Sequence, residues 1–175
     1  LQQEASRKLG FSVSRTMRVA QTLYEGGHIT YMRTDSTNLS DLALEHAEAA
    51  IGELYGASYH QKRQFTGKKA KGAQEAHEAI RPSVMAHSDV KGERDVQRLY
   101  ELIWKRTVAS QMADAKLENT TAIIDISTRE EVFTAKGQVI TFDGFLKLYL
   151  EGSDDEGEEQ DKDRLPAMTV SQSLD

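Results

Sequence analysis

The sequence of 175 residues contains no cysteine. Disulfide bonds and metal sites built on thiolates are therefore excluded. The chain also has no apolar run long enough to cross a bilayer and no amino-terminal signal sequence, so we expect a cytoplasmic protein without a membrane partner. The first residue is not methionine and the chain starts within a helical pattern, which predicts a piece of a longer polypeptide.

The negative charge of the chain is confined to one segment. The formal net charge is −6, and residues 151–164 hold eight acidic and two basic residues, which account for all of it. Acidic residues mixed with Gly and Ser predict a flexible, solvated loop or linker there. Residues 1–115 have a slight positive excess, with 16 Lys and Arg against 14 Asp and Glu.

Apolar periodicity predicts a helical first part. We expect helices over 1–9, 14–25 and 40–55 and a long helix over 93–113. Glycines follow the first three, and Ser40 can cap the third. The run HITYMR, residues 28–33, has the composition of a strand. Helix, short turn, helix and strand is the order of a helix-turn-helix with the first strand of a wing. The expected apolar faces of the second and third helices consist of Val13, Met17, Ala20 and Tyr24, and of Leu44, Ala47, Ile51 and Leu54.

The character of the sequence changes after residue 115. Three strands are expected in TTAIIDIST, EEVFTAKG and QVITFDGFLKLYL, joined by turns at 128–130 and at Gly137. The predicted fold class is therefore α+β, with a mainly helical domain over 1–115 followed by a β segment over 116–175.

One short stretch carries an unusual group of side chains. In a strand, alternate residues share a face, so Tyr31, Arg33 and Asp35 would point the same way. A tyrosine in a strand is most often a packing residue. A phenol, a guanidinium and a carboxylate held together would be an unusual group to bury.

A basic loop separates the helices at 40–55 and 93–113. Its lysines, Lys68 and Lys69 among them, lie between glycines, and either a solvated loop or a phosphate-contacting loop would have this composition. The loop ends in QEAHEAIRP, where Arg81 takes an extended conformation before Pro82. His77 lies between two glutamates, and a surface role or a catalytic role is open for it on this pattern alone.

The stretches ITYMRTDSTNLS and QEAHEAIRPS together closely resemble the bacterial type IA DNA topoisomerases, the DNA topoisomerase I family. The resemblance includes LGFS, TMRVAQTLYEGG, LIWKRTVASQM and the FDGF turn, and covers nearly the whole chain. It implies a DNA-cleaving isomerase of the bacterial nucleoid that acts on single-stranded and negatively supercoiled DNA. Residues 1–115 would be the tyrosine-bearing domain, related to catabolite-activator-like helix-turn-helix folds, and residues 116–175 one part of a β-rich arch.

The resemblance also implies roles for individual residues. Tyr31 matches the nucleophile that becomes linked to a 5′ phosphate, and Arg33 matches an arginine that holds the scissile phosphate. His77 and Glu25 match residues near the DNA or the active site. We expect Asp35 to orient Arg33 or to cap the following turn, and Arg81, Lys68 and Lys69 to support DNA binding.

Two further consequences follow from the resemblance. Family members complete the site with a toprim domain whose acidic residues bind Mg²⁺, so the ligands of the cation are expected outside this chain. No cation is expected to be bound to this chain, and the chain alone should not relax DNA.

Two alternatives remain open. In a non-catalytic helix-turn-helix DNA-binding protein, the helix over 14–25 would present Arg15, Arg18 and Gln21 to the major groove. In a structural or interaction module, Tyr31 would only pack.

Overall fold

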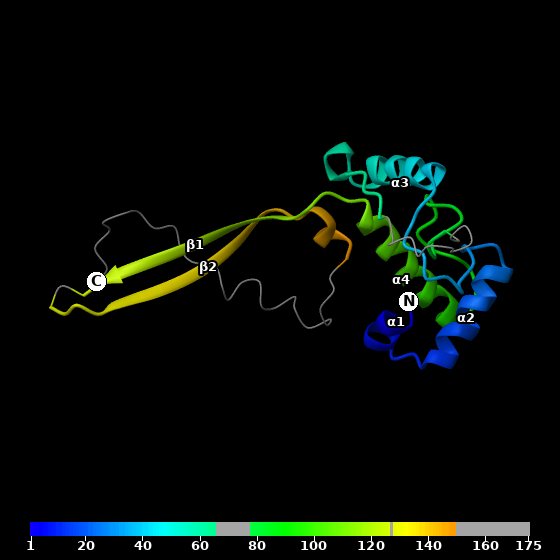
Figure 1. Cartoon of the computed structure of the whole chain (residues 1–175), viewed down its shortest axis with the longest axis horizontal. Helices are drawn as coiled ribbons and strands as arrows, with labels where there is room; N and C mark the ends of the chain where they lie inside the picture. Colours follow the sequence, from blue (N-terminus) through cyan, green and yellow to red (C-terminus); the bar gives the residue numbers. More distant parts are fainter. Residues whose placement is uncertain (66–77, 127, 150–175) are drawn as a thin grey trace, which may run out of the picture. The chain divides into compact units, whose positions relative to one another are not determined.

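The computed structural model describes residues 1–65, 78–126 and 128–149, and its element order confirms the α+β class (Figure 1). The helical part consists of α1 (Gln2–Leu9), α2 (Val13–Glu25), α3 (Asp41–Leu54), the short 3-10 helix η1 (Ala57–Tyr59) and α4 (Arg94–Ser110). Strands β1 (Lys116–Asp125) and β2 (Val132–Phe142) follow, and then the 3-10 helix η2 (Gly144–Lys147). Lys68, Lys69, His77 and the acidic run at 151–164 lie outside the described residues.

The described chain forms two compact units. The first contains Leu1–Asp114 together with the segment that starts at Gly144, and the second contains the hairpin of β1 and β2. None of the helices in the described ranges combines the length and apolarity that crossing a bilayer requires.

The ends of the predicted helices are set by local hydrogen bonds. The Ser12 hydroxyl accepts a hydrogen bond from the Arg15 backbone N–H at 3.2 Å, and the Ser40 hydroxyl accepts one from the Ala43 N–H at 3.3 Å. Each serine thereby satisfies a backbone donor that the first turn of a helix leaves unpaired. Gly10 ends α1 with φ at 67°, a conformation that favours glycine. The helices expected over 1–9, 14–25 and 40–55 are confirmed to within a residue at each end, and the long one is confirmed over Arg94–Ser110.

The core of the helical unit is built around α4. This helix packs against α1 and α2, as Figure 1 shows, and its Leu99, Ile103 and Val108 are at most 3% exposed. Trp104 is also buried, and its indole N–H donates to the Met85 carbonyl at 2.8 Å. Burial of such side chains is the main favourable term in folding, so α4 is the element on which the unit depends most.

The buried face of α2 differs from the apolar face that was predicted for it. Val13 is 58% exposed and Tyr24 40%, whereas Thr16 and Leu23 are fully buried. The side of α2 that meets α4 and Phe11 in the core carries Thr16, Val19, Ala20 and Leu23. In α3, likewise, Leu54 is 50% exposed because the helix buries its Ala43, Leu44, Ala47, Ala50 and Ile51 side.

The strand predicted over 28–33 does not form. Ile29 makes a single antiparallel bridge with Pro82, and no ladder extends from it. On either side of this bridge the backbone donors turn elsewhere, since the Arg81 N–H donates to the Thr30 hydroxyl and the His28 N–H to the Leu23 carbonyl, so the pairing stops there. The wing of the predicted helix-turn-helix therefore has no strand at 28–33, and kinship with catabolite-activator-like folds stays a prediction.

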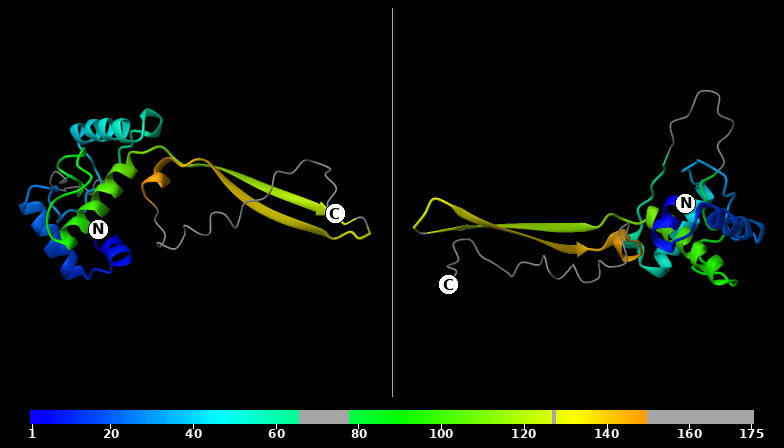
Figure 2. Two further views of the ribbon diagram at one scale, coloured as in Figure 1. Left: turned by 180° about the vertical axis from the view of Figure 1, so that it is seen from behind. Right: turned by 90° about the horizontal axis from the view of Figure 1, so that it is seen from below.

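Two strands, rather than three, follow α4 in the described residues. β1 and β2 pair antiparallel along their length, with Ala122 opposite Ala135 and Thr120 opposite Gly137 (Figure 2). The turn predicted at Gly137 was wrong, since this glycine lies inside β2. The turn expected at 128–130 does lie between the two strands.

The predicted continuation of the last strand through FLKLYL was also wrong. Gly144 has a φ of 50°, and a Cβ on it would lie 2.5 Å from the Ala113 carbonyl oxygen. The glycine thus allows the chain to turn against the end of α4, where the Phe145 N–H donates to the same carbonyl at 2.9 Å. Residues after this turn join the core of the helical unit, and Tyr149 is only 5% exposed.

Candidate active site

Two glycines end α2 and direct the chain toward Tyr31. The Gly26 N–H donates to the Thr22 carbonyl and the His28 N–H to the Leu23 carbonyl, both at 2.9 Å. Gly27 adopts a φ of 72°, which a residue with a side chain rarely takes. The reversal that they create starts the segment 28–39 at the end of a helix that is firmly packed in the core.

The segment that carries Tyr31 is held against residues 79–83, about fifty positions further along the chain. The Thr30 N–H donates to the Arg81 carbonyl at 2.9 Å, and the Arg81 N–H donates to the Thr30 hydroxyl at 2.9 Å. The same hydroxyl donates to the Ala79 carbonyl at 2.7 Å, and the Ser83 N–H donates to the His28 carbonyl at 2.9 Å. The two stretches that carry the family resemblance are therefore one structural unit.

Burial alternates along the tyrosine segment although no strand forms. Tyr31 is 37% exposed, Met32 is 4% exposed and packs into the core, and Arg33 and Asp35 are exposed. Met32 anchors the backbone, so its neighbours on both sides are turned outward. Tyr31, Arg33 and Asp35 are all exposed, but the strand from which a common face was predicted does not form.

Tyr31 is supported on one flank by Tyr24, in the last turn of α2. The two ring centroids are 5.3 Å apart and the ring planes meet at 65°, an edge-to-face contact of the kind that aromatic pairs prefer. Glu25 beside it is exposed, and its carboxylate accepts a hydrogen bond from the Gln21 amide at 2.6 Å. The phenol of Tyr31 is thus accessible while its ring is restrained.

Glu78 joins the QEAHEAIRP motif to the start of α3. Its Oε1 accepts hydrogen bonds from the Ser40 N–H and hydroxyl, both at 2.8 Å, and from Arg81 Nε at 2.7 Å, while Oε2 accepts from Arg81 Nη2 at 2.8 Å. Partial burial would raise the pKa of Glu78, but the hydrogen bonds from Arg81 and Ser40 outweigh it and hold the pKa below its ordinary value. The carboxylate is therefore a structural clamp at neutral pH.

Comparison with known proteins identifies the family. A model of the DNA topoisomerase family matches residues 1–175. The chain belongs to the bacterial type IA DNA topoisomerases. It is 53% identical to DNA topoisomerase 1 of Streptomyces coelicolor over 99% of this chain and 19% of that protein. It is also 53% identical to DNA topoisomerase 1 of Mycobacterium tuberculosis, over 100% of this chain and 20% of that protein.

A solved structure agrees with these matches. Full-length topoisomerase I from Thermotoga maritima is similar with a TM-score of 0.68 and 40% sequence identity, over 84% of this chain and 25% of that chain. This topoisomerase chain spans about a fifth of the length of the relatives from Streptomyces and Mycobacterium.

The predicted site residues of this topoisomerase chain fall into three groups. Tyr31, Arg33 and Asp35 are exposed on one segment, with Glu25 at the end of the preceding helix. Arg81 is mostly buried, and its guanidinium is occupied by Glu78 and by the Pro82 carbonyl at 2.9 Å. The third group, His77, Lys68 and Lys69, lies outside the described residues.

The local role expected of Asp35 is filled by other residues. Within the described ranges, the side chains of Arg33 and Asp35 make no hydrogen bond or ion pair. The Ser36 N–H instead donates to the Thr34 hydroxyl at 3.0 Å, and the Asn38 N–H donates to the Ser36 hydroxyl at 3.1 Å. Both side chains therefore remain accessible to a ligand.

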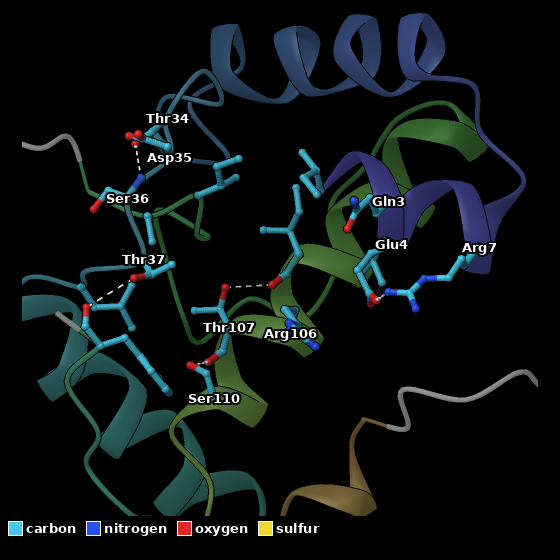
Figure 3. Close-up of a pocket in the computed structure, with 17 residues that line it drawn as sticks. Gln3, Glu4, Arg7, Thr34, Asp35, Ser36, Thr37, Arg106, Thr107 and Ser110 are labelled. Atoms are coloured by element: carbon cyan, nitrogen blue, oxygen red, sulfur yellow. Dashed lines mark hydrogen bonds and ion pairs between the residues drawn. The ribbon is translucent and has the colours of Figure 1, made fainter. Parts of the chain in front are cut away.

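A cavity of about 580 Å³ lies beside this segment (Figure 3). Residues 34–37 line it on one side, while Glu4 and Arg7 of α1, joined by an ion pair of 2.7 Å, line it on another. Its apolar part includes Leu39, Leu102 and Ile103. A cavity of this size, lined by both apolar and polar side chains, suits a small ligand or one unit of a polymer.

Sequence reasoning missed two residues that build the site. Thr30 joins the segment 28–39 to residues 79–81, and Glu78 joins the segment 78–83 to Ser40, through contacts between residues 38 or more positions apart. The spacing of Glu78 three positions before Arg81 was the available signal for their ion pair. In the described part of the chain no three His, Asp or Glu side chains are grouped so that they could hold a metal ion.

Proposed function

We propose that this chain carries the strand-cleaving tyrosine of a longer, ATP-independent topoisomerase that relaxes negatively supercoiled DNA. The observation that supports it is the accessible, ring-restrained Tyr31 on a segment anchored by Met32 and Thr30, with Arg33 open beside it. The proposed work of the enzyme is to cut one strand, let another pass and reseal the cut.

The proposed reaction conserves the energy of the broken bond. The Tyr31 phenol oxygen attacks a backbone phosphorus and forms a new P–O bond, while the bond from phosphorus to the 3′ oxygen breaks. The phenol loses a proton and the departing 3′ oxygen gains one. The result is a 5′-phosphotyrosyl link and a free 3′ hydroxyl, which reseals the strand by the reverse attack.

The proposed role of Arg33 is to hold the scissile phosphate. A guanidinium presents two parallel donors that match phosphate oxygens, and negative charge grows on those oxygens in the transition state. Glu25 and Asp35 lie close to this point along the chain, and we assign them, together with His77, Lys68 and Lys69, to support of the bound strand. Arg81 acts through its ion pair with Glu78, as a positioning residue.

The remaining parts of the proposed enzyme lie outside this chain. A toprim domain would supply Mg²⁺ and its acidic ligands, and no step above is assigned to the cation, because the described residues offer no site for one. Residues 1–115 would form the tyrosine-bearing domain and residues 116–175 one part of the arch. Substrate DNA would place the enzyme in the bacterial cytoplasm.

The alternative of a helix-turn-helix protein that reads DNA with α2 has less support. Arg15 is held by Asp95 through two hydrogen bonds of 2.6 and 2.8 Å, and Gln21 is held by Glu25. Two of the three side chains that would face the major groove are therefore engaged within the protein.

Replacement of Tyr31 by Phe tests the proposal in the longer enzyme. Tyr31→Phe removes one oxygen and keeps the ring that contacts Tyr24, so melting should be nearly unchanged. We expect no covalent protein–DNA adduct on a 5′-labelled or 3′-labelled oligonucleotide and no relaxation, while DNA binding remains.

Tyr24→Phe is the matched control, since it makes the same change in the neighbouring ring. We expect this variant to form the adduct. An adduct from Tyr31→Phe, or its loss in Tyr24→Phe alone, would show that Tyr31 is not the nucleophile.

A further inference from the structure

A second polar groove lies along α2, away from the cavity beside residues 34–37. Its volume is about 650 Å³, and it runs between α2 and the segment that leads into α4. Arg15, Arg18, Thr22 and Gly26 line it at helical spacing, with Lys91 and Glu93 on the opposite side. At 1.5 Å of rise per residue the α2 side is about 16 Å long.

Among the described residues that line the groove, more cationic than anionic side chains lack an ion-pair partner. The charge of Arg15 is matched by Asp95 in a bidentate pair, with distances of 2.6 and 2.8 Å. Arg18 and Lys91 are exposed and make no hydrogen bond or ion pair from their side chains within the described residues. Glu93 is the one acidic side chain of the lining that is not paired in this way.

Further cations stand near the groove. Arg15, Arg98 and Arg94 all act to lower the pKa of Asp95, the hydrogen bond from Arg15 being the largest cause. Hydroxyls of Ser12, Ser14 and Thr22 and the imidazole of His28 complete the polar lining. None of the described residues that line the groove is Phe, Tyr or Trp, so they offer charge and hydrogen bonds but no broad surface on which a base could stack.

The groove and the tyrosine lie on opposite flanks of α2. Tyr24, which contacts Tyr31, is two residues from Thr22, and two residues turn an α-helix by more than half a circle. Thr22 faces the groove. A phosphate bound in the groove is therefore a different one from the phosphate attacked by Tyr31.

We propose that this groove binds the phosphate backbone of a DNA strand at a second point, separate from the point of cleavage. The inference rests on the proposed function, which makes DNA the polymer that this face meets. Contacts to phosphates alone carry no sequence information, so binding here is independent of base sequence and sensitive to salt.

The test measures binding of a labelled oligothymidylate to the longer enzyme across a range of KCl concentrations. All variants carry Tyr31→Phe, so that no covalent product forms. Loss of two contacts to single-stranded phosphates in Arg18→Ala/Lys91→Ala should reduce the slope of log K against log salt by about 1.4. The pair Arg129→Ala/Lys136→Ala, at exposed positions of the hairpin unit, removes the same charge elsewhere and should keep the slope.

A third variant gives a change in the opposite direction. Glu93→Gln removes the acidic side chain that opposes a phosphate, so its affinity for the oligothymidylate should rise, which partial unfolding would not produce. An unchanged slope in the Arg18/Lys91 variant, an equal fall in the hairpin pair, or no gain with Glu93→Gln would each overturn the inference. A groove that docks another part of the protein would leave the slope unchanged and lower the melting temperature, and this too would overturn it.

The adduct assay on the enzyme with Tyr31 intact reports separately on the proposed function. An enzyme that forms the adduct but shows no groove-dependent slope would retain the function and lose the second binding point. An enzyme without the adduct would lose the function itself.

Discussion

Arg33 is the residue whose contribution can be separated most clearly from general electrostatics. It lies two positions after Tyr31, exposed and without a partner in the described part of the chain. Arg98 on α4 would be a poor control, because it is half-buried and its guanidinium lies 5.5 Å from the centre of the Phe11 ring. Arg129, exposed in the turn of the hairpin, is a better one.

Arg33→Lys should retain much of the DNA binding and slow cleavage, since lysine offers a point charge instead of a two-pronged donor. Arg33→Ala should slow cleavage further, because a preorganised donor at a developing charge contributes ~3 kcal/mol, roughly a hundredfold in rate. Single-turnover cleavage of a short oligonucleotide by the longer enzyme measures both. If Arg33→Lys, Arg33→Ala and Arg129→Ala slow cleavage equally, Arg33 contributes only to the general positive charge of the protein.

The tyrosine segment depends on contacts between elements that are far apart in the sequence. The Glu78 carboxylate accepts hydrogen bonds from Ser40, at the start of α3, and from Arg81, in the segment 79–83 that holds Thr30. The side chain of Glu78 is 23% exposed and that of Arg81 14%, so this ion pair is shielded more than the i,i+4 pair of Glu101 with Lys105. Shielded, hydrogen-bonded pairs contribute more than exposed ones.

Glu78→Gln should lower the free energy of unfolding at pH 7 by about 1 kcal/mol, below the full worth of a charged hydrogen bond because the site is partly exposed. The pKa of Glu78 is lowered in the folded protein, so its stabilisation is present above the ordinary carboxyl pKa and is lost as the pH falls through the folded value. The difference between the parent and Glu78→Gln should therefore shrink in acid. Urea unfolding of the chain at a series of pH values measures it.

Glu101→Gln provides the comparison for that experiment, since its pair is exposed and should contribute only about 0.3–0.5 kcal/mol. If Glu78→Gln lowers the free energy of unfolding no more than Glu101→Gln does, Glu78 is not a structural clamp.

The chain as a whole contains one half of the proposed site. Tyr31 and Arg33 lie in it, while the described residues hold no group of side chains suited to a cation. It also spans about a fifth of the length of its relatives from Streptomyces and Mycobacterium. Division of the reaction between parts of a longer polypeptide follows from the proposal.

The 175-residue chain alone should bind single-stranded DNA weakly and with strong dependence on salt, and should not relax supercoiled plasmid. Filter binding over a salt series and gel electrophoresis of plasmid with added Mg²⁺ test the two parts. Relaxation by a clean preparation would contradict the division of the site. Absence of any salt-dependent binding would contradict the role of its basic side chains.

Features that depend on neighbours a few residues apart could be predicted from the sequence. The caps at Ser12 and Ser40 and the left-handed end at Gly10 act within three residues, so the helix limits agreed closely with the prediction. The motif around Tyr31 likewise marked the family, because it depends on residue types along one stretch.

Features that depend on distant partners were decided by the fold. The buried side of α2 is the one that meets α4 and Phe11, and no count along α2 reveals that side. Residues 28–33 have a strand composition but lack a ladder, because the Arg81 N–H donates to the Thr30 hydroxyl and the His28 N–H to the Leu23 carbonyl. Thr30 and Glu78 gain their roles from residues 38 to 51 positions away, and hydrogen-bond partners at such separations are set by packing rather than by local preference.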